Sequence, residues 1–147
     1  MPNNNDLRNL LTYRIVALSR DITYFNHRNA IPTKDLNIPE MRILSLCFTL
    51  GECNQTNFVK NALHGDPGNI SRYINKLENK GYLKSTKDKK DKRLKWLKLT
   101  AKGKKTAEKY IHSRQLHNKK LTSQFTKSEL IQFEELLSKT AEFYSAH

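Results

Sequence analysis

Apolar residues recur at helical spacing along much of the chain, and the first stripe lies within residues 6–28. Its members fall at intervals of four and three residues, the pattern of a long helix that packs along another helix. The stripe consists of Leu11, Ile15, Leu18, Ile22 and Phe25. Periodicity alone leaves open whether this stripe is buried inside its own domain or along a helix elsewhere.

A second helix is predicted by a start signal and a stop signal. Asn37 is placed to cap the helix N-terminus, and Glu40, three residues later, is the matching capping-box residue. A proline in the first turn strengthens this signal. Gly51 is expected to end the helix. A short third helix fits residues 55–63.

The sharpest start signal lies at Asp66 and Pro67, which suit the N-cap and the first position of a fourth helix. Gly81 is the expected C-terminal stop. The apolar face between these signals repeats at i, i+3, i+4 and i+7 through Ile70, Tyr73, Ile74 and Leu77. Two short helices joined by a tight, glycine-containing turn are typical of a helix-turn-helix.

Two β-prone runs follow, at residues 82–86 and 94–99, and a charged loop over residues 87–93 separates them. A hairpin with a basic tip directly after a helix-turn-helix predicts a wing. Two further helices are expected, one over residues 101–121 and one that opens with a capping box at Thr126. The sequence therefore predicts a mainly α fold with a small β-hairpin wing, namely a winged helix-turn-helix with flanking helices.

Charge narrows the choice of partner. The formal net charge is +13, and residues 84–109 alone carry +9, from 12 Lys or Arg and 3 Asp or Glu. Such a cluster favours a polyanionic partner, either nucleic acid or an anionic membrane surface. The longest nearly apolar run, residues 43–50, is too short to span a bilayer. The first residues lack the apolar stretch of a secretory signal, so we expect a cytoplasmic protein with reduced thiols.

Motifs of catalysis and metal binding do not occur in the sequence. It contains no glycine-rich phosphate loop, nucleophile motif or metal-ligand cluster, so we expect a protein that is not an enzyme and uses neither cofactor nor metal. Cys47 lies among apolar helix positions and is predicted to be a buried structural thiol. Cys53 falls in a loop, where it would be exposed.

Four segments together resemble the MarR family of bacterial transcription regulators. Residues 36–44 resemble the opening of that family's second helix, and residues 66–83 resemble its recognition helix and the turn into its wing. Residues 91–103 match its wing motif, with Asp-x-Arg at 91–93, Leu-Thr at 99–100 and Gly at 103. The final helix resembles its dimerisation helix.

A length of 147 residues predicts a single domain over residues 1–147. The resemblance implies that the chain assembles as a homodimer. Residues 34–102 would form the DNA-binding lobe, while residues 6–33 and 103–147 would form dimerisation helices. It further implies a repressor that reads a palindromic operator and is released by a small aromatic ligand. Two alternatives stay open: an architectural protein that coats DNA without sequence preference, and a winged-helix module that binds another protein.

The predicted DNA contacts come from the recognition helix and the wing. The helix face opposite the apolar stripe carries Gly68, Asn69, Ser71, Arg72, Asn75 and Lys76. Asn can bond adenine, Arg can bond guanine and Ser can contact a phosphate. On the wing, Arg93 is expected to enter the minor groove while Asp91 shapes the tip. The alternative reading of both segments is an ordinary solvated, charged surface.

Overall fold

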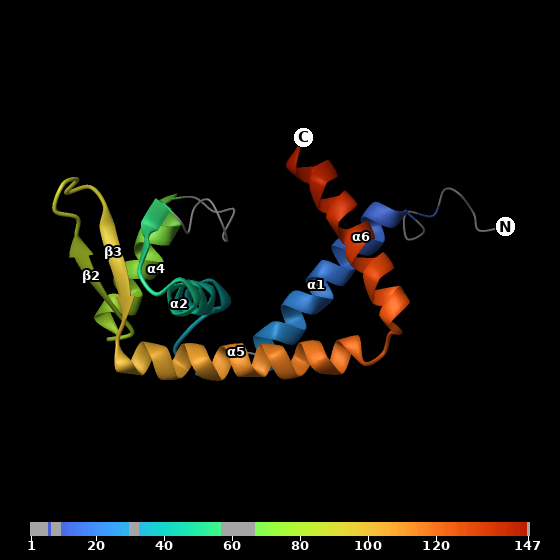
Figure 1. The fold of residues 1–147 in the computed structure, drawn as a ribbon, viewed down its shortest axis with the longest axis horizontal. Helices are drawn as coiled ribbons and strands as arrows, with labels where there is room; N and C mark the ends of the chain where they lie inside the picture. Colours follow the sequence, from blue (N-terminus) through green and yellow to red (C-terminus); the bar gives the residue numbers. More distant parts are fainter. Residues whose placement is uncertain (1–5, 7–9, 30–32, 57–66, 147) are drawn as a thin grey trace. The chain divides into compact units, whose positions relative to one another are not determined.

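The structure is a computed structural model that describes residues 6, 10–29, 33–56 and 67–146. Its elements are α1 (Leu11–Asn29), α2 (Ile38–Leu50), β1 (Cys53–Asn54), α4 (Pro67–Asn79), β2 (Leu83–Lys87), β3 (Lys95–Leu99), α5 (Ala101–Thr122) and α6 (Lys127–Ser145) (Figure 1). The chain divides into two compact units, residues 1–111 and residues 112–147. The predicted helix over residues 55–63 and the predicted cap at Asp66 lie largely outside the described residues.

The predicted signals of α2 and α6 are confirmed in atomic detail. The Asn37 side chain accepts a hydrogen bond from the Glu40 backbone N–H at 2.9 Å, and the Glu40 carboxylate accepts one from the Asn37 N–H at 3.0 Å. Gly51 ends α2 with a φ of 77°. Thr126 and Glu129 form the same reciprocal pair at the start of α6. Each pair satisfies N–H groups that a helix N-terminus leaves unpaired.

In the part of the chain that the structure describes, three antiparallel strands form one sheet in the order β1-β3-β2. The register places Leu83 opposite Leu99, and it places both Ser85 and Cys53 opposite Leu97. The hairpin of β2 and β3 is the predicted wing. Strand β1 was not predicted, and it makes the expectation for Cys53 wrong: this side chain is buried at 0% exposure, because its pairing to β3 turns it toward the core.

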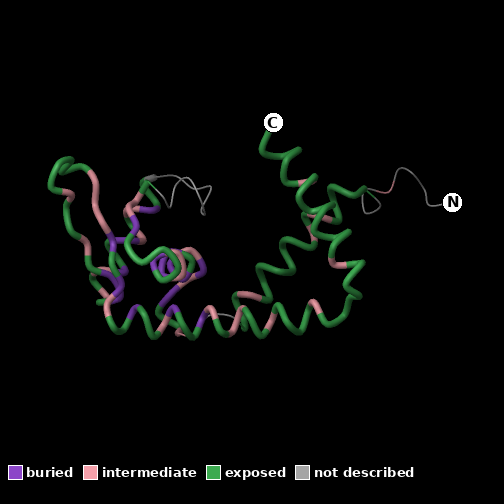
Figure 2. Tube along the Cα trace, in the orientation of Figure 1, coloured by how far each residue is buried: buried purple, intermediate pink, exposed green. Residues whose placement is uncertain are grey.

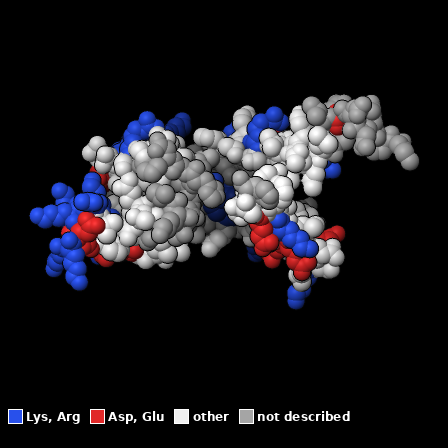
Figure 3. Space-filling view, turned by 90° about the horizontal axis from the view of Figure 1, so that it is seen from above, with Lys and Arg blue, Asp and Glu red and all other residues white. Residues whose placement is uncertain are grey.

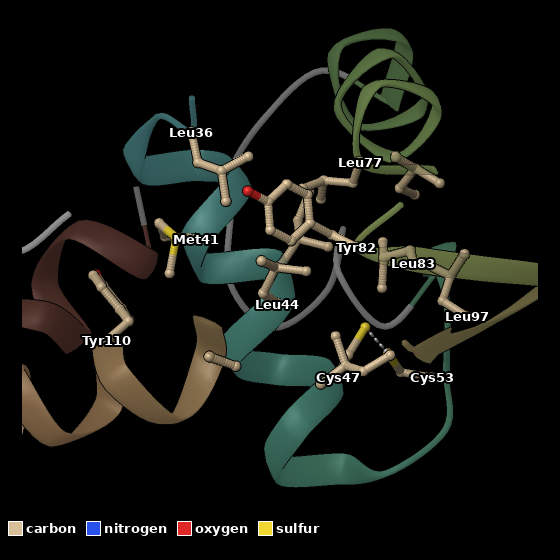
Figure 4. Close-up of a cluster of buried hydrophobic side chains, with 14 of the residues drawn as sticks. Leu36, Met41, Leu44, Cys47, Cys53, Leu77, Tyr82, Leu83, Leu97 and Tyr110 are labelled. Carbon is tan, nitrogen blue, oxygen red and sulfur yellow. Dashed lines mark hydrogen bonds between the residues drawn. The ribbon is translucent and has the colours of Figure 1, made fainter. Parts of the chain in front are cut away.

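The core of residues 1–111 lies where α2, α4, the sheet and the first turns of α5 meet. Figure 2 shows this concentration of buried residues, and Figure 4 shows their side chains pointing toward one another. The buried cluster comprises Leu36, Met41, Ile43, Leu44, Cys47, Cys53, Ile70, Ile74, Leu77, Tyr82, Leu83, Leu97, Leu99, Ala107 and Tyr110. Three of the four predicted inward positions of α4 are in this cluster, and the fourth, Tyr73, packs against it half-buried.

The long helices α1 and α6 differ from this lobe in the burial of their residues. Neither Leu11–Asn29 nor Lys127–Ser145 contains a buried residue. Large apolar side chains on both are open to solvent in the single chain, including Val16 and Leu18 on α1 and Leu136 and Phe143 on α6. Among the described residues, no helix is both long enough and apolar enough to cross a membrane.

Candidate nucleic-acid interface

The outer face of α4 is polar and basic, as the sequence pattern requires once its apolar face is buried. Gly68, Asn69, Arg72, Asn75 and Lys76 are exposed along it. The Asn side chains can donate to and accept from base edges, and the Arg and Lys side chains can donate to base edges or phosphates. Five of the six predicted contact residues of this helix therefore lie open to solvent on one side of the lobe.

Arg72 is held by its neighbours on the helix. Its Nη2 donates to the Asn69 Oδ1 at 3.0 Å, and its guanidinium carbon lies 5.8 Å from the centre of the Tyr73 ring. A guanidinium so placed loses less rotamer freedom when it meets a ligand. The two residues with the most specific predicted base contacts thus form one hydrogen-bonded pair.

Two predicted contacts also hold α4 to the rest of the lobe. Ser71 is half-buried, and its hydroxyl accepts a hydrogen bond from the Gln55 side chain. The Lys76 ammonium lies 2.6 Å from the Oε1 of Glu40, whose carboxylate is fully buried. Because the Lys76 side chain is still 46% exposed, this ion pair leaves part of it accessible at the surface. The sequence pattern did not reveal these attachments, since both join segments far apart in the chain.

The tip of the wing is a folded turn. The backbone N–H of Asp88 donates to the Leu94 carbonyl, and that of Leu94 donates to the Asp91 carbonyl, each at 2.9 Å. The Asp91 carboxylate accepts the backbone N–H of Arg93 at 2.9 Å, which gives Asp91 its expected part in shaping the tip. Arg93 itself is exposed.

Asp88 is the residue that sequence reasoning missed. Its Oδ1 accepts the backbone N–H groups of Lys90 at 2.7 Å and Asp91 at 3.0 Å, and its Oδ2 accepts the indole N–H of Trp96 at 2.7 Å. These donors, that of Asp91 first, lower the pKa of the Asp88 carboxyl below its usual value. An Asp at the start of a loop, with a Trp on the returning strand that needs a partner for its N–H, was the available signal.

The base of the wing is fixed against α5. The Thr100 hydroxyl donates to the Gly81 carbonyl at 2.7 Å and accepts the N–H of Gly103 at 3.1 Å. The Lys102 ammonium lies 4.2 Å from the centre of the Tyr82 ring and donates to the Lys80 carbonyl at 2.9 Å. The Thr and Gly of the predicted wing motif therefore serve to join the wing to α5.

Basic side chains gather on this unit. Figure 3 shows Lys and Arg projecting at the left of the view, where the wing lies. Along the hairpin they are Lys84, Lys87, Lys89, Lys90, Lys92, Arg93, Lys95 and Lys98. One of them, Lys98, is paired with Glu52 at 3.8 Å. A positive wing next to a polar helix face has the charge and shape of a surface for a nucleic-acid backbone.

Comparison with protein families decides the class of this fold. A family model described as "Winged helix DNA-binding domain" matches residues 41–116, just over half of the 147 residues. The chain belongs to this winged helix DNA-binding family. Its matched segment runs from α2 through the wing into α5, and so includes both predicted contact surfaces of the winged helix domain.

Several solved structures share the fold of this winged helix protein. The S. aureus MepR–DNA complex aligns with a TM-score of 0.81 at 20% identity, covering 92% of this chain and 98% of that one. A MarR protein from Peptoclostridium difficile aligns with a TM-score of 0.80 at 23% identity, covering 98% and 92%. BpsR of Bordetella bronchiseptica, whose DNA binding is regulated by 6-hydroxynicotinic acid, aligns with a TM-score of 0.79 at 17% identity, covering 95% and 98%.

These likenesses confirm the predicted fold, including the flanking helices that extend beyond the family model. A comparison with curated proteins finds no match. The DNA contacts assigned to single residues stay predictions.

Proposed function

We propose that this protein is a cytoplasmic, MarR-type transcriptional repressor that reads a palindromic operator as a homodimer. The observation that carries the proposal is the pairing of an exposed polar face on α4 with a structured basic wing in one lobe. The DNA-bound form of MepR, a protein of the same fold, supports it.

Base reading is assigned to α4. Its length and its attachment by Ile70, Ile74 and Leu77 leave Asn69 and Arg72 on the open side. The major groove admits a helix and presents a distinct donor and acceptor pattern for each base pair. Gly68 allows close approach of the helix start, while Ser71, Asn75 and Lys76 supply flanking polar contacts.

The wing is assigned to the minor groove. Arg93 would enter it, since a narrow minor groove attracts arginine. Asp91 and Asp88 would keep the tip folded while the surrounding lysines neutralise phosphates.

A homodimer is supported by the apolar stripes of α1 and α6. The predicted stripe of α6 includes Phe133 and Leu137, which are 43% and 53% exposed in the single chain. Contiguous apolar surface of this kind marks an interface. A palindromic operator needs two lobes related by a twofold axis.

A small aromatic anion is the proposed effector. A cavity of about 530 Å³ lies within residues 1–111, and its lining includes the basic residues His27, Arg28, Lys34 and Lys76. Arg28 also contacts the ring of Tyr24 at 5.6 Å. Lys76 belongs to α4, so a ligand here would act on the proposed reading helix. The regulation of BpsR by 6-hydroxynicotinic acid supports this class of ligand.

The test is selection of bound sequences from a randomised DNA library at two salt concentrations. We expect a palindromic consensus, and we expect affinity to fall steeply with salt because phosphate contacts release counterions. Arg72→Ala should cost about 1–3 kcal/mol per lost bidentate contact and blur one position in each half-site. Arg93→Ala should mainly reduce discrimination at A·T-rich flanks.

The same experiment separates the alternatives. DNA affinity without a consensus would identify an architectural protein, and no affinity at modest salt would identify a protein-interaction module. An Arg72→Ala profile identical to that of the unaltered protein would show that α4 does not read bases. Lys139→Glu, an exposed substitution on α6, serves as the control and should leave the consensus unchanged.

A further inference from the structure

A second cavity lies in the winged helix lobe, where the end of α2, the end of β3 and the start of α5 meet. Its volume is about 580 Å³, which falls in the range of cavities that hold small molecules. It shares no lining residue with the cavity beside α1 that the proposed effector would occupy. Neither the outer face of α4 nor the tip of the wing contributes to it.

The buried part of the lining is apolar. Cys47 and Leu99 are 1% and 8% exposed, and Phe48 beside them is 38% exposed. The Cys47 thiol is hydrogen-bonded to Cys53 at 2.9 Å, so it has a partner without any ligand (Figure 4). An apolar group that entered the cavity would therefore be stabilised here by leaving water.

Four charged side chains, two of each sign, complete the lining. Lys98 and Glu52 are paired with each other at 3.8 Å. The other two are Lys104 and Glu108 on α5. Within the part of the chain that the structure describes, neither the Lys104 ammonium nor the Glu108 carboxylate has an ion-pair or hydrogen-bond partner. One cavity thus offers a positive and a negative group that are both available to a ligand.

The order of these two charges along α5 sets the direction of a bound ligand. Residues four apart lie on one face of a helix, and a lysine that precedes a glutamate is the weaker order for a direct pair. The first turn of α5 contains no acidic residue, so the positive end of the helix dipole adds to the attraction of Lys104 for an anion. Glu108 lies one turn further along and attracts a cation.

We propose that this cavity binds a free α-amino acid with an apolar side chain. The carboxylate of the amino acid binds the Lys104 ammonium, its ammonium group binds the Glu108 carboxylate, and its side chain packs on Leu99 and Phe48. An α-amino acid carries both charges on one carbon atom, which suits two opposite charges one helical turn apart. Leucine, methionine and phenylalanine are the members of this class that we consider.

The paired charges also exclude simpler ligands. A carboxylic acid without an amine would leave Glu108 unmatched and would be repelled by it, and an amine without a carboxylate would meet the same obstacle at Lys104. An amino acid with a charged side chain would bring that charge onto the apolar part of the lining, where its desolvation is costly. The cavity therefore selects for two charges and an apolar side chain together.

Binding would connect three elements of the lobe. The ligand would contact α2 through Phe48, β3 through Leu99 and α5 through Lys104 and Glu108. Because the unfolded chain has no such cavity, a ligand bound there stabilises the folded state by mass action. The melting temperature should therefore rise with the concentration of the amino acid.

The test titrates the intact, isotope-labelled protein with L-leucine, L-methionine and L-phenylalanine and follows its backbone amide resonances. We expect saturable shifts at Gly51, Lys98 and Lys104, together with a higher melting temperature. Glycine, which has both charges and no side chain, should bind more weakly than all three. The compounds 3-phenylpropionate and 2-phenylethylamine each lack one charge of phenylalanine, and each should bind about 5-fold or more weakly than phenylalanine.

Two variants assign the charges. Lys104→Gln should weaken the binding of phenylalanine but not that of 2-phenylethylamine, which has no carboxylate to lose its partner. Glu108→Gln should weaken the binding of phenylalanine but not that of 3-phenylpropionate. A purely structural role for either residue would not produce this dependence on the ligand. Lys105→Gln and Glu135→Gln, exposed positions outside the lining, are the matched controls and should bind phenylalanine as the unaltered protein does.

Several results would overturn the site. They are the lack of any shift with the three amino acids at about 10 mM, shifts confined to the residues of the cavity beside α1, and unchanged phenylalanine affinity in both variants. Equal affinities for phenylalanine and 3-phenylpropionate would overturn the assignment of an amino acid. None of these measurements uses DNA, so the outcome does not depend on the proposed function.

Discussion

Asp88 shows how one side chain organises residues that are expected to touch DNA. Its carboxylate gathers two backbone N–H groups of the tip and the indole of the returning strand. Arg93, the residue expected to enter the minor groove, sits in the turn that these bonds help to close. The sequence pointed to the charges of the tip because they are plainly visible in it. It did not reveal which acid accepts the hydrogen bonds, since that depends on the register of β2 and β3.

The lowered pKa of Asp88 predicts how the wing tip responds to acid. The hydrogen bonds favour its ionised form, so their stabilising effect is complete above the usual carboxyl pKa of about 3.9. It is lost as pH falls through the lowered pKa. Trp96 is the single tryptophan, and its fluorescence should change over that acid range. Asp88→Asn should remove this component, while Glu129→Gln should retain it. Superimposable titrations of Asp88→Asn and the unaltered protein would contradict the assignment.

Lys76 illustrates a residue with two uses. It was predicted from its position on the outer face of α4, yet its ammonium also neutralises the buried Glu40 carboxylate. Lys76→Met should destabilise the fold by about 1–3 kcal/mol, because a buried carboxylate loses its partner while solvent screens part of the effect. Urea unfolding measures this change. Glu40→Gln in the Lys76→Met background should recover much of the loss, and Asn75→Ala is the neighbouring control. Additive losses in the double variant would contradict the pairing.

At the scale of elements, the predictable parts are those encoded by neighbouring residues. The caps of α2 and α6 lie within four-residue windows, and the apolar period of α4 lies within one helix, so all three could be read from sequence. Strand β1 has two residues, and it forms because its backbone pairs with the edge of β3. A segment that short carries no period of its own, and the burial of Cys53 was missed for the same reason.

Gly103 joins two elements more closely than any other residue type would permit. A Cβ built there would lie far inside contact distance of the Tyr82 backbone carbonyl. Gly103→Ala should therefore force α5 away from the wing base and cost about 1–3 kcal/mol, as overpacking does. Thermal unfolding followed by circular dichroism measures the loss. Lys105→Ala, an exposed change on the same helix, should alter stability by less than about 0.5 kcal/mol. Equal stabilities for the two variants would show that α5 can move aside without cost.

At the scale of the whole molecule, the lobe and the long helices α1 and α6 differ in whether a single chain buries their apolar residues. The lobe buries its apolar face within one chain, as the cluster from Leu36 to Tyr110 demonstrates. The stripes of α1 and α6 were visible in the sequence as periodic patterns, but a pattern does not say what covers it. Their exposure in a single chain is the observation that favours a second copy over internal burial.

Leu137→Glu tests that assembly without disturbing the lobe. Leu137 is 53% exposed in the single chain, so the substitution should leave a monomer's fold intact. In a twofold dimer the change occurs twice, and burying a leucine contributes about 1.5–3 kcal/mol. The dissociation constant of the dimer should therefore rise by about 100-fold or more. Sedimentation across a concentration series measures this constant. Lys139→Glu, on the opposite side of α6, should leave the dimer unchanged. A folded monomer for the unaltered chain at micromolar concentration would rule the dimer out, and operator binding would then have to come from single lobes.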